Sequence, residues 1–596
     1  MNSKTTKTSR EQLKISSNVH ELVGDELYPL PLLLGQESRL KASLAGVVPF
    51  AWKVLIVTGL ILGARYLWWR WSFSLNTETY ALAVTVVMAE TLAFIGVCLL
   101  FYNLWDKPKV KPANVPVDWS DCSWSESPEQ RPLSVDVLIT TYDESPAILA
   151  DTLEAANALH YPYEIEKNIW VLDDGDRSEI CNLAHRFGVN YLSRQTNEGF
   201  KAGNLENALR QTNADFFVIC DADTKLAPNF LSRTLGYFRD RKIAWVQCPH
   251  WFTDTAKGHR FGDLVTKFFG KLGASIATKL PSSVGGFRFG ADPLQMDQHI
   301  FFVNIMSPRN RNNAAFCCGA ASVHRRAALE DNLSRAEDIA FVTKDNEGRP
   351  TYFNYHVSED LYTSMRFHAD KIGGWKSVQI DEKIAEMQSP QDMLTRTIQR
   401  FKYAGGSMDL LLHKGAPFQK GFSLPQRLMY GTTFFFYLSF LWNLVFLSVP
   451  AIFLLTGFSP INRTAGELLT YFLPYYLILE VAFIVGFWGQ NVFKSRAWAM
   501  ADFSIQLAAF WTVIRGREIK FKVTPKQKSS GMHLRLIWPH ILFFVANLGA
   551  VLWALFYWIT FNEPIFDGGR PVVLFWALFN AWNMWQPIQA CLWLRK

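Results

Sequence analysis

Six long apolar runs constrain how this chain of 596 residues can fold. Each supplies the roughly 20 apolar residues that an α-helix needs to cross a lipid bilayer. The runs are Gly46–Trp71, Tyr80–Trp105, Tyr430–Phe458, Leu468–Gly489, Ile537–Phe561 and Pro571–Leu594. A seventh run, Ala497–Ile514, is weaker because Asp502 and Gln506 interrupt it, and it predicts an amphipathic helix along the membrane interface. The sequence therefore predicts an integral membrane protein with six spanning helices.

Basic residues predict which side of the membrane each part faces. Lys107, Lys109 and Lys111 follow the second run, and residues 515–535 carry seven further Lys and Arg residues. The other short loops hold few, so the basic segments are expected in the cytoplasm. The polar segment Met1–Ser43 lacks the short apolar core of a signal peptide and predicts a cytoplasmic tail. Both termini and the long stretch between the second and third runs are therefore expected inside.

That long stretch, from Asp106 to Arg427, has the pattern of an α/β domain. Short β-branched runs end in polar residues, and helical patterns such as Ala147–Leu159 lie between them. These runs are Val135–Tyr142, Asn168–Asp174, Phe216–Asp221 and Ile243–Gln247. Alternating strands and helices predict a mostly parallel sheet. Ligands bind such sheets at the carboxyl ends of the strands, so the polar residues there are expected to share one crevice.

Three acidic clusters stand out in this domain: Asp173-Asp174-Gly175, Asp221-Ala222-Asp223 and Ser358-Glu359-Asp360. A single Asp after a strand is often only a helix cap or a turn residue. Two carboxylates spaced as Asp221 and Asp223 are better suited to share a hard divalent cation, Mg²⁺ or Mn²⁺, with substrate phosphates. Such a cation would neutralise a departing diphosphate.

Charge and cysteine content exclude other classes of function. The net charge of +7 is modest for this length and is explained by the basic cytoplasmic loops, so nucleic-acid binding does not follow. The eight cysteines form no CxxC pairs at zinc-ligand spacing.

The ordered motifs resemble those of the processive family-2 glycosyltransferases, of the bacterial cellulose synthase catalytic subunit type. The resemblance covers about Val135 to Lys526 and the flanking membrane helices. The motifs are Thr141-Tyr142-Asp143-Glu144, Leu172-Asp173-Asp174-Gly175, Lys201-Ala202-Gly203-Asn204-Leu205, Asp221-Ala222-Asp223, Val246-Gln247-Cys248-Pro249-His250, Phe316-Cys317-Cys318-Gly319, Ser358-Glu359-Asp360 and Phe521-Lys522-Val523-Thr524-Pro525.

The resemblance implies a Rossmann-like GT-A glycosyltransferase domain, inserted between transmembrane helices of the bacterial inner membrane and facing the cytoplasm. The expected order is a tail (1–45), two spanning helices (46–105), the GT-A domain ending in interfacial helices (106–427), two spanning helices (428–489), an interfacial helix and gating loop (490–536) and two spanning helices (537–596).

The resemblance also implies roles for individual residues. Tyr142 would stack on the uracil of a UDP-sugar, and Asp360 would be the general base that deprotonates the acceptor hydroxyl. Asp221 and Asp223 would hold the nucleotide and the metal. The other residues implied at the donor are Glu144, Asp174, Lys201, Gln399, Arg400, Lys402 and Thr524, and those implied at the acceptor glycan are Cys318, Trp375 and Tyr403.

Two departures from the family pattern affect the expected product and regulation. The family motif Gln-x-x-Arg-Trp is replaced by Gln399-Arg400-Phe401-Lys402-Tyr403. Lys402 loses the bidentate fork of arginine, and Tyr403 offers a smaller ring than tryptophan, so acceptor geometry and linkage could differ. The sixth run ends at Leu594, so we expect no cyclic-di-GMP-binding PilZ domain in this chain, with the Phe521–Pro525 gating motif closing unaided or under a partner's control.

The leading hypothesis is a synthase that polymerises UDP-glucose into a β-1,4-glucan and secretes it, with the growing polysaccharide, the bilayer and accessory export subunits as partners. A curdlan-like β-1,3-glucan or a mixed-linkage product is the runner-up because of Lys402 and Tyr403. Hyaluronan- or chitin-type synthesis is the third hypothesis for the product. A non-processive enzyme acting on a lipid carrier is disfavoured by helices on both sides of the domain, and a non-catalytic export scaffold by the intact Asp221, Asp223 and Asp360.

Overall fold

The computed structural model describes residues 39–125, 129–255, 259–279, 288–289, 292–294, 297–339, 341–487, 490–519, 533–563 and 569–592. Two compact units are distinguished within the chain. The smaller comprises the chain up to Phe50 and His259–Arg288, and holds the first turns of α2 (Arg39–Phe73), β8 (His259–Arg260) and α8 (Phe261–Lys279). The larger unit, Ala51–Gly258 and Phe289–Lys596, contains the candidate functional site described below.

A seven-stranded sheet is the centre of the larger unit. Its spatial order is β11-β6-β10-β4-β1-β2-β3, and β10 alone runs antiparallel to its neighbours. The strands are β1 (Leu133–Thr141), β2 (Ile165–Asp173), β3 (Asn190–Ser193), β4 (Phe216–Asp221), β6 (Ile243–Gln247), β10 (Ser322–Arg325) and β11 (Lys376–Gln379). The mostly parallel α/β sheet expected from the sequence is confirmed.

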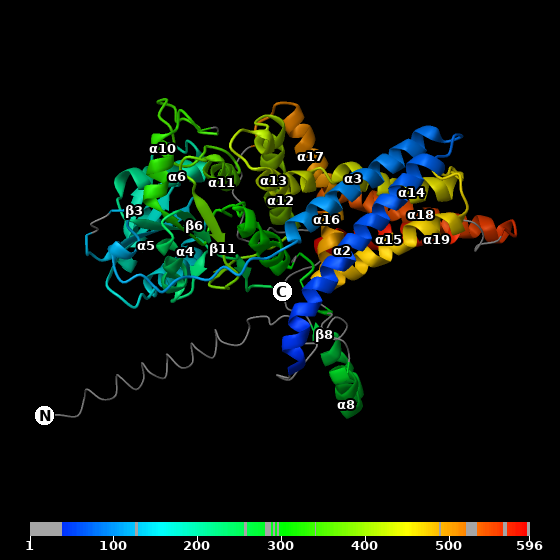
Figure 1. Ribbon diagram of the computed structural model, residues 1–596, viewed down its shortest axis with the longest axis horizontal. Coiled ribbons are helices and arrows are strands. Elements are labelled where there is room, and N and C mark those ends of the chain that lie inside the picture. Colours follow the sequence, from blue (N-terminus) through cyan, green and yellow to red (C-terminus); the bar gives the residue numbers. More distant parts are fainter. Residues whose placement is uncertain are drawn as a thin grey trace. The chain divides into compact units, whose positions relative to one another are not determined.

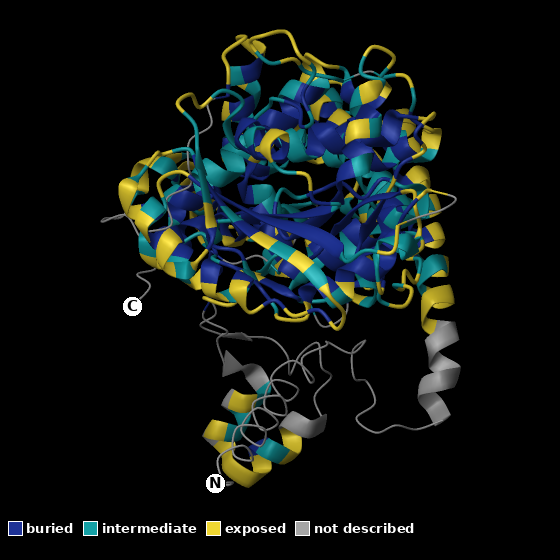
Figure 2. Cartoon of the chain, turned by 90° about the vertical axis from the view of Figure 1, so that its left-hand side faces the viewer, coloured by how far each residue is buried: buried dark blue, intermediate teal, exposed yellow. Residues whose placement is uncertain are grey.

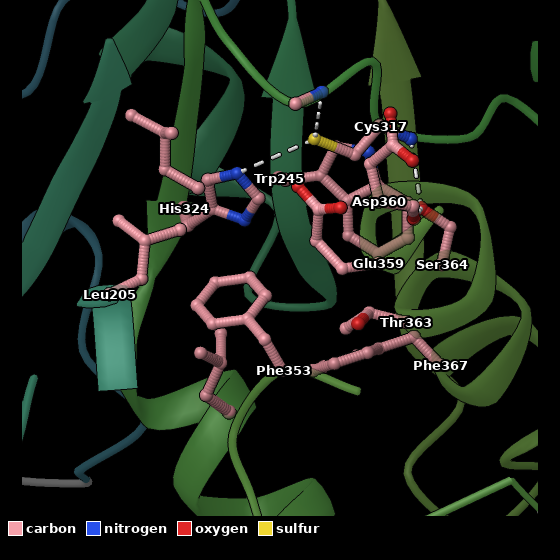
Figure 3. A pocket seen from close by; sticks show the side chains of 13 residues that line it. Leu205, Trp245, Cys317, His324, Phe353, Glu359, Asp360, Thr363, Ser364 and Phe367 are labelled. Carbon is pink, nitrogen blue, oxygen red and sulfur yellow. Dashed lines mark hydrogen bonds between the residues drawn. The ribbon is translucent and has the colours of Figure 1, made fainter. Parts of the chain in front are cut away.

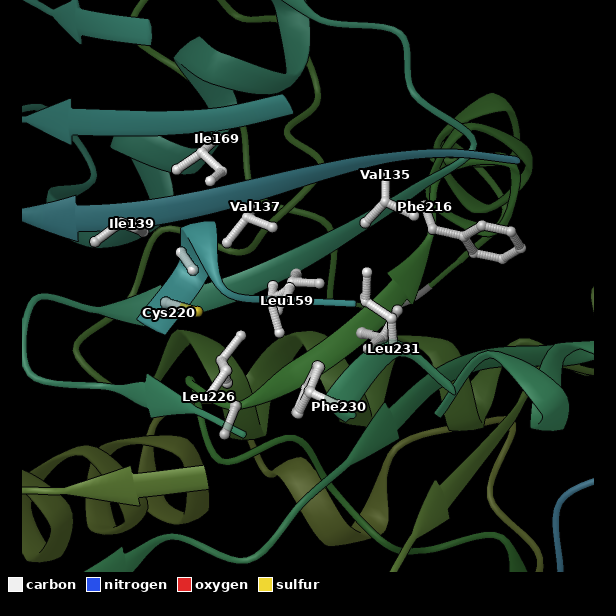
Figure 4. Close-up of a cluster of buried hydrophobic side chains, with 14 of the residues drawn as sticks. Val135, Val137, Ile139, Leu159, Ile169, Phe216, Cys220, Leu226, Phe230 and Leu231 are labelled. Atoms are coloured by element: carbon white, nitrogen blue, oxygen red, sulfur yellow. The ribbon is translucent and has the colours of Figure 1, made fainter. Parts of the chain in front are cut away.

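Helices cover both faces of this sheet, and β1 shows why. Val135, Val137 and Ile139 of β1 pack into one hydrophobic cluster, whereas Leu138 packs into another, because successive strand residues point to opposite faces. Figure 4 shows the first cluster, and Figure 2 shows the strands as the most deeply buried layer. The covering elements are α4 (Pro146–Asn157), α5 (Ser178–Phe187), α6 (Phe200–Gln211), α10 (Arg326–Ser334) and α11 (Glu359–Ala369).

A second, smaller sheet and further helices complete the domain. A second sheet has the order β5-β12-β7. The remaining elements are η1 (Trp119–Asp121), β5 (Lys225–Leu226), α7 (Phe230–Thr234), η2 (Leu235–Arg239), β7 (Trp251–Phe252), η3 (Ile300–Met306), η4 (Ser307–Asn312), β12 (Ala385–Met387), α12 (Met393–Leu412) and η5 (Ala416–Phe418). A separate strand, β9 (Arg288–Phe289), pairs with β8. Figure 1 shows α12 between the large sheet and the long apolar helices.

The long apolar helices largely coincide with the predicted runs. They are α2, α3 (Tyr80–Leu104), α13 (Leu424–Tyr437), α14 (Phe440–Thr456), α15 (Ala465–Gly486), α16 (Val492–Ala501), α17 (Phe503–Ile514), α18 (Trp538–Thr560), preceded by η6 (Leu534–Leu536), and α19 (Arg570–Leu592). Among described residues, five helices are long and apolar enough to cross a membrane, and the pair α13–α14, bent by 43°, would make a sixth. Four of these five, together with the bent pair, match predicted runs.

Two segments differ from the expected pattern. α19 coincides with the sixth run but is not apolar enough to count, and its buried Asn580 donates to the Phe446 carbonyl at 2.8 Å. The run that we expect along the interface forms α16 and α17, broken at Asp502, and Val492–Ile514 meets the spanning criterion with half of its window buried. Its placement along the interface stays a prediction.

Candidate functional site

The carboxyl ends of β1, β2 and β4 meet at one edge of the sheet. Thr141 of β1 lies opposite Asp173 of β2, and Thr140 lies opposite Asp221 of β4. The acidic residues that follow these strands are therefore brought together, as parallel pairing requires.

The turn after β1 presents an aromatic ring at this edge. The Glu144 carboxylate accepts hydrogen bonds from the Tyr142 backbone N–H at 2.8 Å and from the Thr141 hydroxyl at 3.0 Å. The Glu144 carboxylate therefore stabilises the turn by accepting hydrogen bonds from the two residues at its start. The Tyr142 side chain is 43% exposed, which leaves its ring open for stacking.

The two aspartates after β2 are held differently. Asp173 is fully buried and accepts hydrogen bonds from the Arg177 side chain and from the Gly175 and Arg177 backbone, so it stabilises the turn. Asp174 forms a bidentate pair with Arg194, with N–O distances of 2.5 and 2.8 Å. Burial raises the pKa of Asp174, and Arg194 opposes that shift. We do not predict Arg194 from the sequence, and its position just after β3 is the only signal for it.

Lys201, in the first turn of α6, joins the donor side of the site to the motif before β10. Its ammonium group donates to Asp221 and, at 2.7 Å, to the Gly319 carbonyl. Burial alone would lower the pKa of Lys201, but the neighbouring acidic groups, Asp221 first, raise it above its usual value. Lys201 is therefore a fixed cation beside the carboxylates of Asp221 and Asp360.

Gly319 lies at the centre of this arrangement. Its φ of +86° falls in the left-handed region that favours glycine. A Cβ added there would lie 3.4 Å from Asp360 Oδ2 and 3.8 Å from Lys201 Nζ. Gln247 fixes this turn: it is 1% exposed, accepts from the Cys318 N–H at 2.7 Å and donates to the Ala320 carbonyl at 2.8 Å.

Asp360 is the second residue of α11, where the helix dipole favours a negative charge. Its Oδ1 accepts from the Leu361 N–H at 2.7 Å. Burial raises the pKa of Asp360, partly offset by this hydrogen bond and by Lys201. Figure 3 shows Asp360 and Glu359 together with Cys317 and His324 around a small pocket.

Glu359 is a residue of this pocket to which we assign no role from the sequence. Burial, reinforced by the neighbouring Asp360, raises the pKa of Glu359 to about 8. Its carboxyl group therefore holds its proton to a higher pH than an exposed glutamate does. Cys318 lies between Cys317 and Gly319, which both line the pocket, and burial and the charge of Asp360 raise the pKa of its thiol.

Asp221 and Asp223 fit a divalent cation only in part. The Asp221 side chain is 37% exposed and already accepts from Lys201, whereas Asp223 is 2% exposed and accepts from the Gln388 N–H at 3.2 Å. Two carboxylates are an oxygen donor set that suits Mg²⁺ or Mn²⁺. Among described residues no cluster of three His, Cys, Asp or Glu residues could hold a metal, so further ligands would have to come from a bound diphosphate and water.

Helix α12 carries Gln399, Arg400, Lys402 and Tyr403 and contacts the segment before Asp360. Tyr403 is 45% exposed and precedes Gly406 by three residues on the helix, where an added Cβ at Gly406 would contact Ser358, two residues before Asp360. Gln399, Arg400 and Lys402 are half-buried on the same helix. Thr524 and the rest of Phe521–Pro525 lie outside the described residues.

Trp375 is not brought to this edge. It is 2% exposed, and its indole N–H donates to Asp331 at 2.8 Å. Trp375 directly precedes β11, and the next residue, Lys376, pairs with Ile243 at the start of β6. A residue before a parallel strand lies at the edge opposite its carboxyl end, so the position of Trp375 does not support contact with an acceptor.

Comparisons with known proteins agree with the sequence motifs. Residues 136–333 match the model of glycosyl transferase family 2, and residues 309–536 match that of cellulose synthase. The chain is 25% identical over 539 residues to "Cellulose synthase 2" of Novacetimonas hansenii, covering 88% of this chain and 30% of that protein. It is 25% identical over 503 residues to "Cellulose synthase 1 catalytic subunit [UDP-forming]" of Komagataeibacter xylinus, covering 82% and 59%.

A third relative, the cellulose synthase catalytic subunit of Pseudomonas fluorescens, is 26% identical over 426 residues, covering 71% of this chain and 50% of that one. The chain thus spans between about a third and three fifths of the length of these relatives. Among solved structures, the mannosyltransferase PcManGT of Pyrobaculum calidifontis aligns with 73% of this chain and all of that chain, at 15% identity and a TM-score of 0.43. The predicted resemblance is confirmed by the two family domains.

Proposed function

We propose that this chain, with its family-2 glycosyltransferase domain and cellulose synthase region, is a processive inverting glycosyltransferase. It transfers glucose from UDP-glucose to the non-reducing end of a β-glucan, β-1,4-linked by default, and secretes the product through its own helices. The observation that carries the proposal is the convergence of Lys201, Asp221 and Asp360 around Gly319 at the carboxyl edge of the sheet.

The residues that follow β1, β2 and β4 bind the donor. The exposed ring of Tyr142 stacks on the uracil, and Asp174, oriented by Arg194, lies at the same edge. Lys201 supplies a positive charge next to the Asp221 carboxylate, where a diphosphate leaving group needs neutralisation. A divalent cation bound by Asp221 and Asp223 would add Lewis-acid stabilisation of that leaving group.

Asp360 acts as the base. It takes the proton of the acceptor hydroxyl while that oxygen forms a bond to the anomeric carbon, and the bond from that carbon to UDP breaks on the opposite face. The raised pKa of Asp360 makes its carboxylate a stronger proton acceptor than an exposed one. The positive charge of Lys201, which approaches Asp360 across Gly319, favours the ionised form of the carboxylate.

The acceptor is held by α12. Tyr403 is partly exposed next to the Asp360 and Asp221 charges, so a terminal sugar stacked on its ring would present its hydroxyl to Asp360. Because α12 packs against α13 and α17, a glycan leaving this position meets the apolar helices directly. This arrangement couples transfer to export.

A β-1,3 or mixed linkage is the second candidate product. Tyr403 and Lys402 replace the tryptophan and arginine expected at these positions, and a smaller ring allows a different rotation of the terminal sugar. The acidic residues and Lys201 are unaffected by this choice. Linkage is therefore decided by α12 and the transfer chemistry by α6, α11 and β4.

The test is to supply UDP-glucose, UDP-N-acetylglucosamine and UDP-glucuronate one at a time to the purified protein in lipid nanodiscs, with Mg²⁺ or Mn²⁺. UDP release and polymer are measured together, and the polymer is digested with linkage-specific glucanases. We expect polymer from UDP-glucose alone. UDP release without polymer would contradict processivity, and no UDP release from any donor would contradict the enzyme class.

A further inference from the structure

The loop before Asp360 is tied to α12 by a histidine. His356 Nδ1 accepts a hydrogen bond from the Ser358 backbone N–H at 3.0 Å, and His356 Nε2 lies 3.0 Å from Asp409 Oδ2. Because Nδ1 accepts from a backbone donor, the ring proton resides on Nε2, which donates to Asp409. One imidazole thus joins the N-terminus of α11 to α12.

The acceptor of this bond is a stable carboxylate. The hydrogen bond from His356, together with a second contact from His413 at 2.7 Å, lowers the pKa of Asp409 to about 2. The His356 side chain is 11% exposed and that of Asp409 is 27% exposed, whereas that of His413 is 45% exposed. Of the two contacts to Asp409, the one from His356 is therefore better shielded from solvent than the one from His413.

The same two segments also touch through a close packing contact. A Cβ added to Gly406 would lie 2.1 Å from Ser358 Oγ and 2.8 Å from Val357 Cγ1. Gly406 thus allows α12 to approach the residues just before Asp360. A packing contact of this kind sets the distance between two elements but leaves their sliding and rotation free, whereas directional hydrogen bonds fix both.

We propose that His356 and Asp409 are positioning residues that keep Asp360 in register with the acceptor-binding face of α12, which carries Tyr403. This proposal rests on the proposed function, in which Asp360 is the base and α12 holds the acceptor. Neither His356 nor Asp409 touches the substrate. They act on the geometry between two groups that must meet at the acceptor oxygen, where small displacements are costly to the rate.

Two substitutions at one position separate the two bonds of His356. In His356→Asn the amide oxygen reaches the place of Nδ1, so the bond from the Ser358 N–H is kept and the link to Asp409 is lost. In His356→Gln the amide reaches the place of Nε2, so the link is kept and the local bond is lost. Asp409→Leu removes the acceptor, and Asp409→Asn keeps an uncharged one.

The expected results follow from a role through Asp360. His356→Asn and Asp409→Leu should lower kcat for polymer synthesis by about 10- to 100-fold, the range for supporting contacts, and leave the Kd for UDP unchanged. The ratio of donor hydrolysis to transfer should rise, because the acceptor and the base are out of register. His356→Gln and Asp409→Asn should retain more activity. The double variant His356→Asn/Asp409→Leu should be no slower than the slower single variant.

His413→Gln is the matched control, since it removes an exposed contact to the same carboxylate and should change kcat by less than about twofold. Wild-type kcat in all variants, or multiplied losses in the double variant, would overturn the positioning role. If the wild type itself releases no UDP, the proposed function fails instead. Because UDP binding reports folding of the donor site, a variant that loses it is replaced by its conservative partner at the same position.

Discussion

Lys201 Nζ donates a hydrogen bond to the Gly319 carbonyl oxygen at 2.7 Å while it pairs with Asp221. One side chain thereby connects three parts of the fold: α6, the end of β4 and the turn before β10. Because Gly319 faces Asp360, the cation on the donor side and the base on the acceptor side share one glycine. The arrangement explains why distant motifs occur together in one chain.

Replacing Lys201 by Met tests the role of this charge. The change removes the cation next to the leaving group, so kcat should fall by about 10²- to 10³-fold, as when one stabilising donor is removed. Binding of UDP, measured by calorimetry, should also weaken. Lys201→Arg keeps the charge and should recover part of the activity. A Met variant as active as the wild type would exclude Lys201 from charge stabilisation.

Gly406 is predicted to tolerate no side chain. The added methyl group of Gly406→Ala would lie 2.1 Å from Ser358 Oγ, so the contact must shift, at about 1–3 kcal/mol for overpacking. Thermal unfolding should occur at lower temperature and kcat should fall. Gly431→Ala on α13 is the control, because no atom of the described part of the chain lies within 4 Å of its added Cβ. Equal effects of the two substitutions would contradict close packing at Gly406.

Breaking the buried ion pair between Arg396 of α12 and Asp502 should cause a large loss of stability. Their N–O distances are 2.7 and 3.2 Å, and the guanidinium lies 3.7 Å from the Trp498 ring centroid. Asp502→Ala leaves Arg396 buried without that carboxylate and should cost about 3–5 kcal/mol.

Thermal unfolding in detergent measures this cost. Asp151→Ala is the control: it removes a pair with Lys225 in which the two side chains are 56% and 43% exposed, and it should cost no more than about 1 kcal/mol. An Asp502→Ala variant as stable as the control would show that the pair does not hold α12 to the helices.

Strand ends and acidic motifs are predictable from the sequence, whereas contacts between distant segments are not. The alternation of β1 places Val135 and Val137 in one core cluster, and parallel pairing then brings Thr141 and Asp173 together. The Asp409–His356 bond joins residues 53 positions apart, and no local pattern signals it.

The two sequence expectations that fit the structure least have physical reasons. Trp375 precedes its strand instead of following it, which places it at the other edge of the sheet. α19 is mostly apolar, but polar residues such as Asn580 and Asn583 lower its hydropathy below that of a spanning helix, and both of these asparagines are buried.

The raised pKa of Glu359 should make the free energy of unfolding depend on pH. Its pKa rises from 4.5 to about 8 on folding, chiefly through burial. The folded state therefore holds a proton that the unfolded state loses, so the contribution of Glu359 is full below pH 4.5 and declines until about pH 8. Melting temperatures at pH 5 and pH 8.5 should differ less in Glu359→Gln than in the wild type. An identical difference in both proteins would contradict a buried, protonated Glu359.

Asp360 as the general base is the central claim, and Asp360→Asn tests it most directly. The measurement pairs polymer synthesis from UDP-glucose with calorimetric binding of UDP by the same preparation. The account predicts that polymer is lost while UDP binds as it does to the wild type, because the amide cannot accept the acceptor proton but alters no donor contact. Polymer made at the wild-type rate by Asp360→Asn would contradict the account.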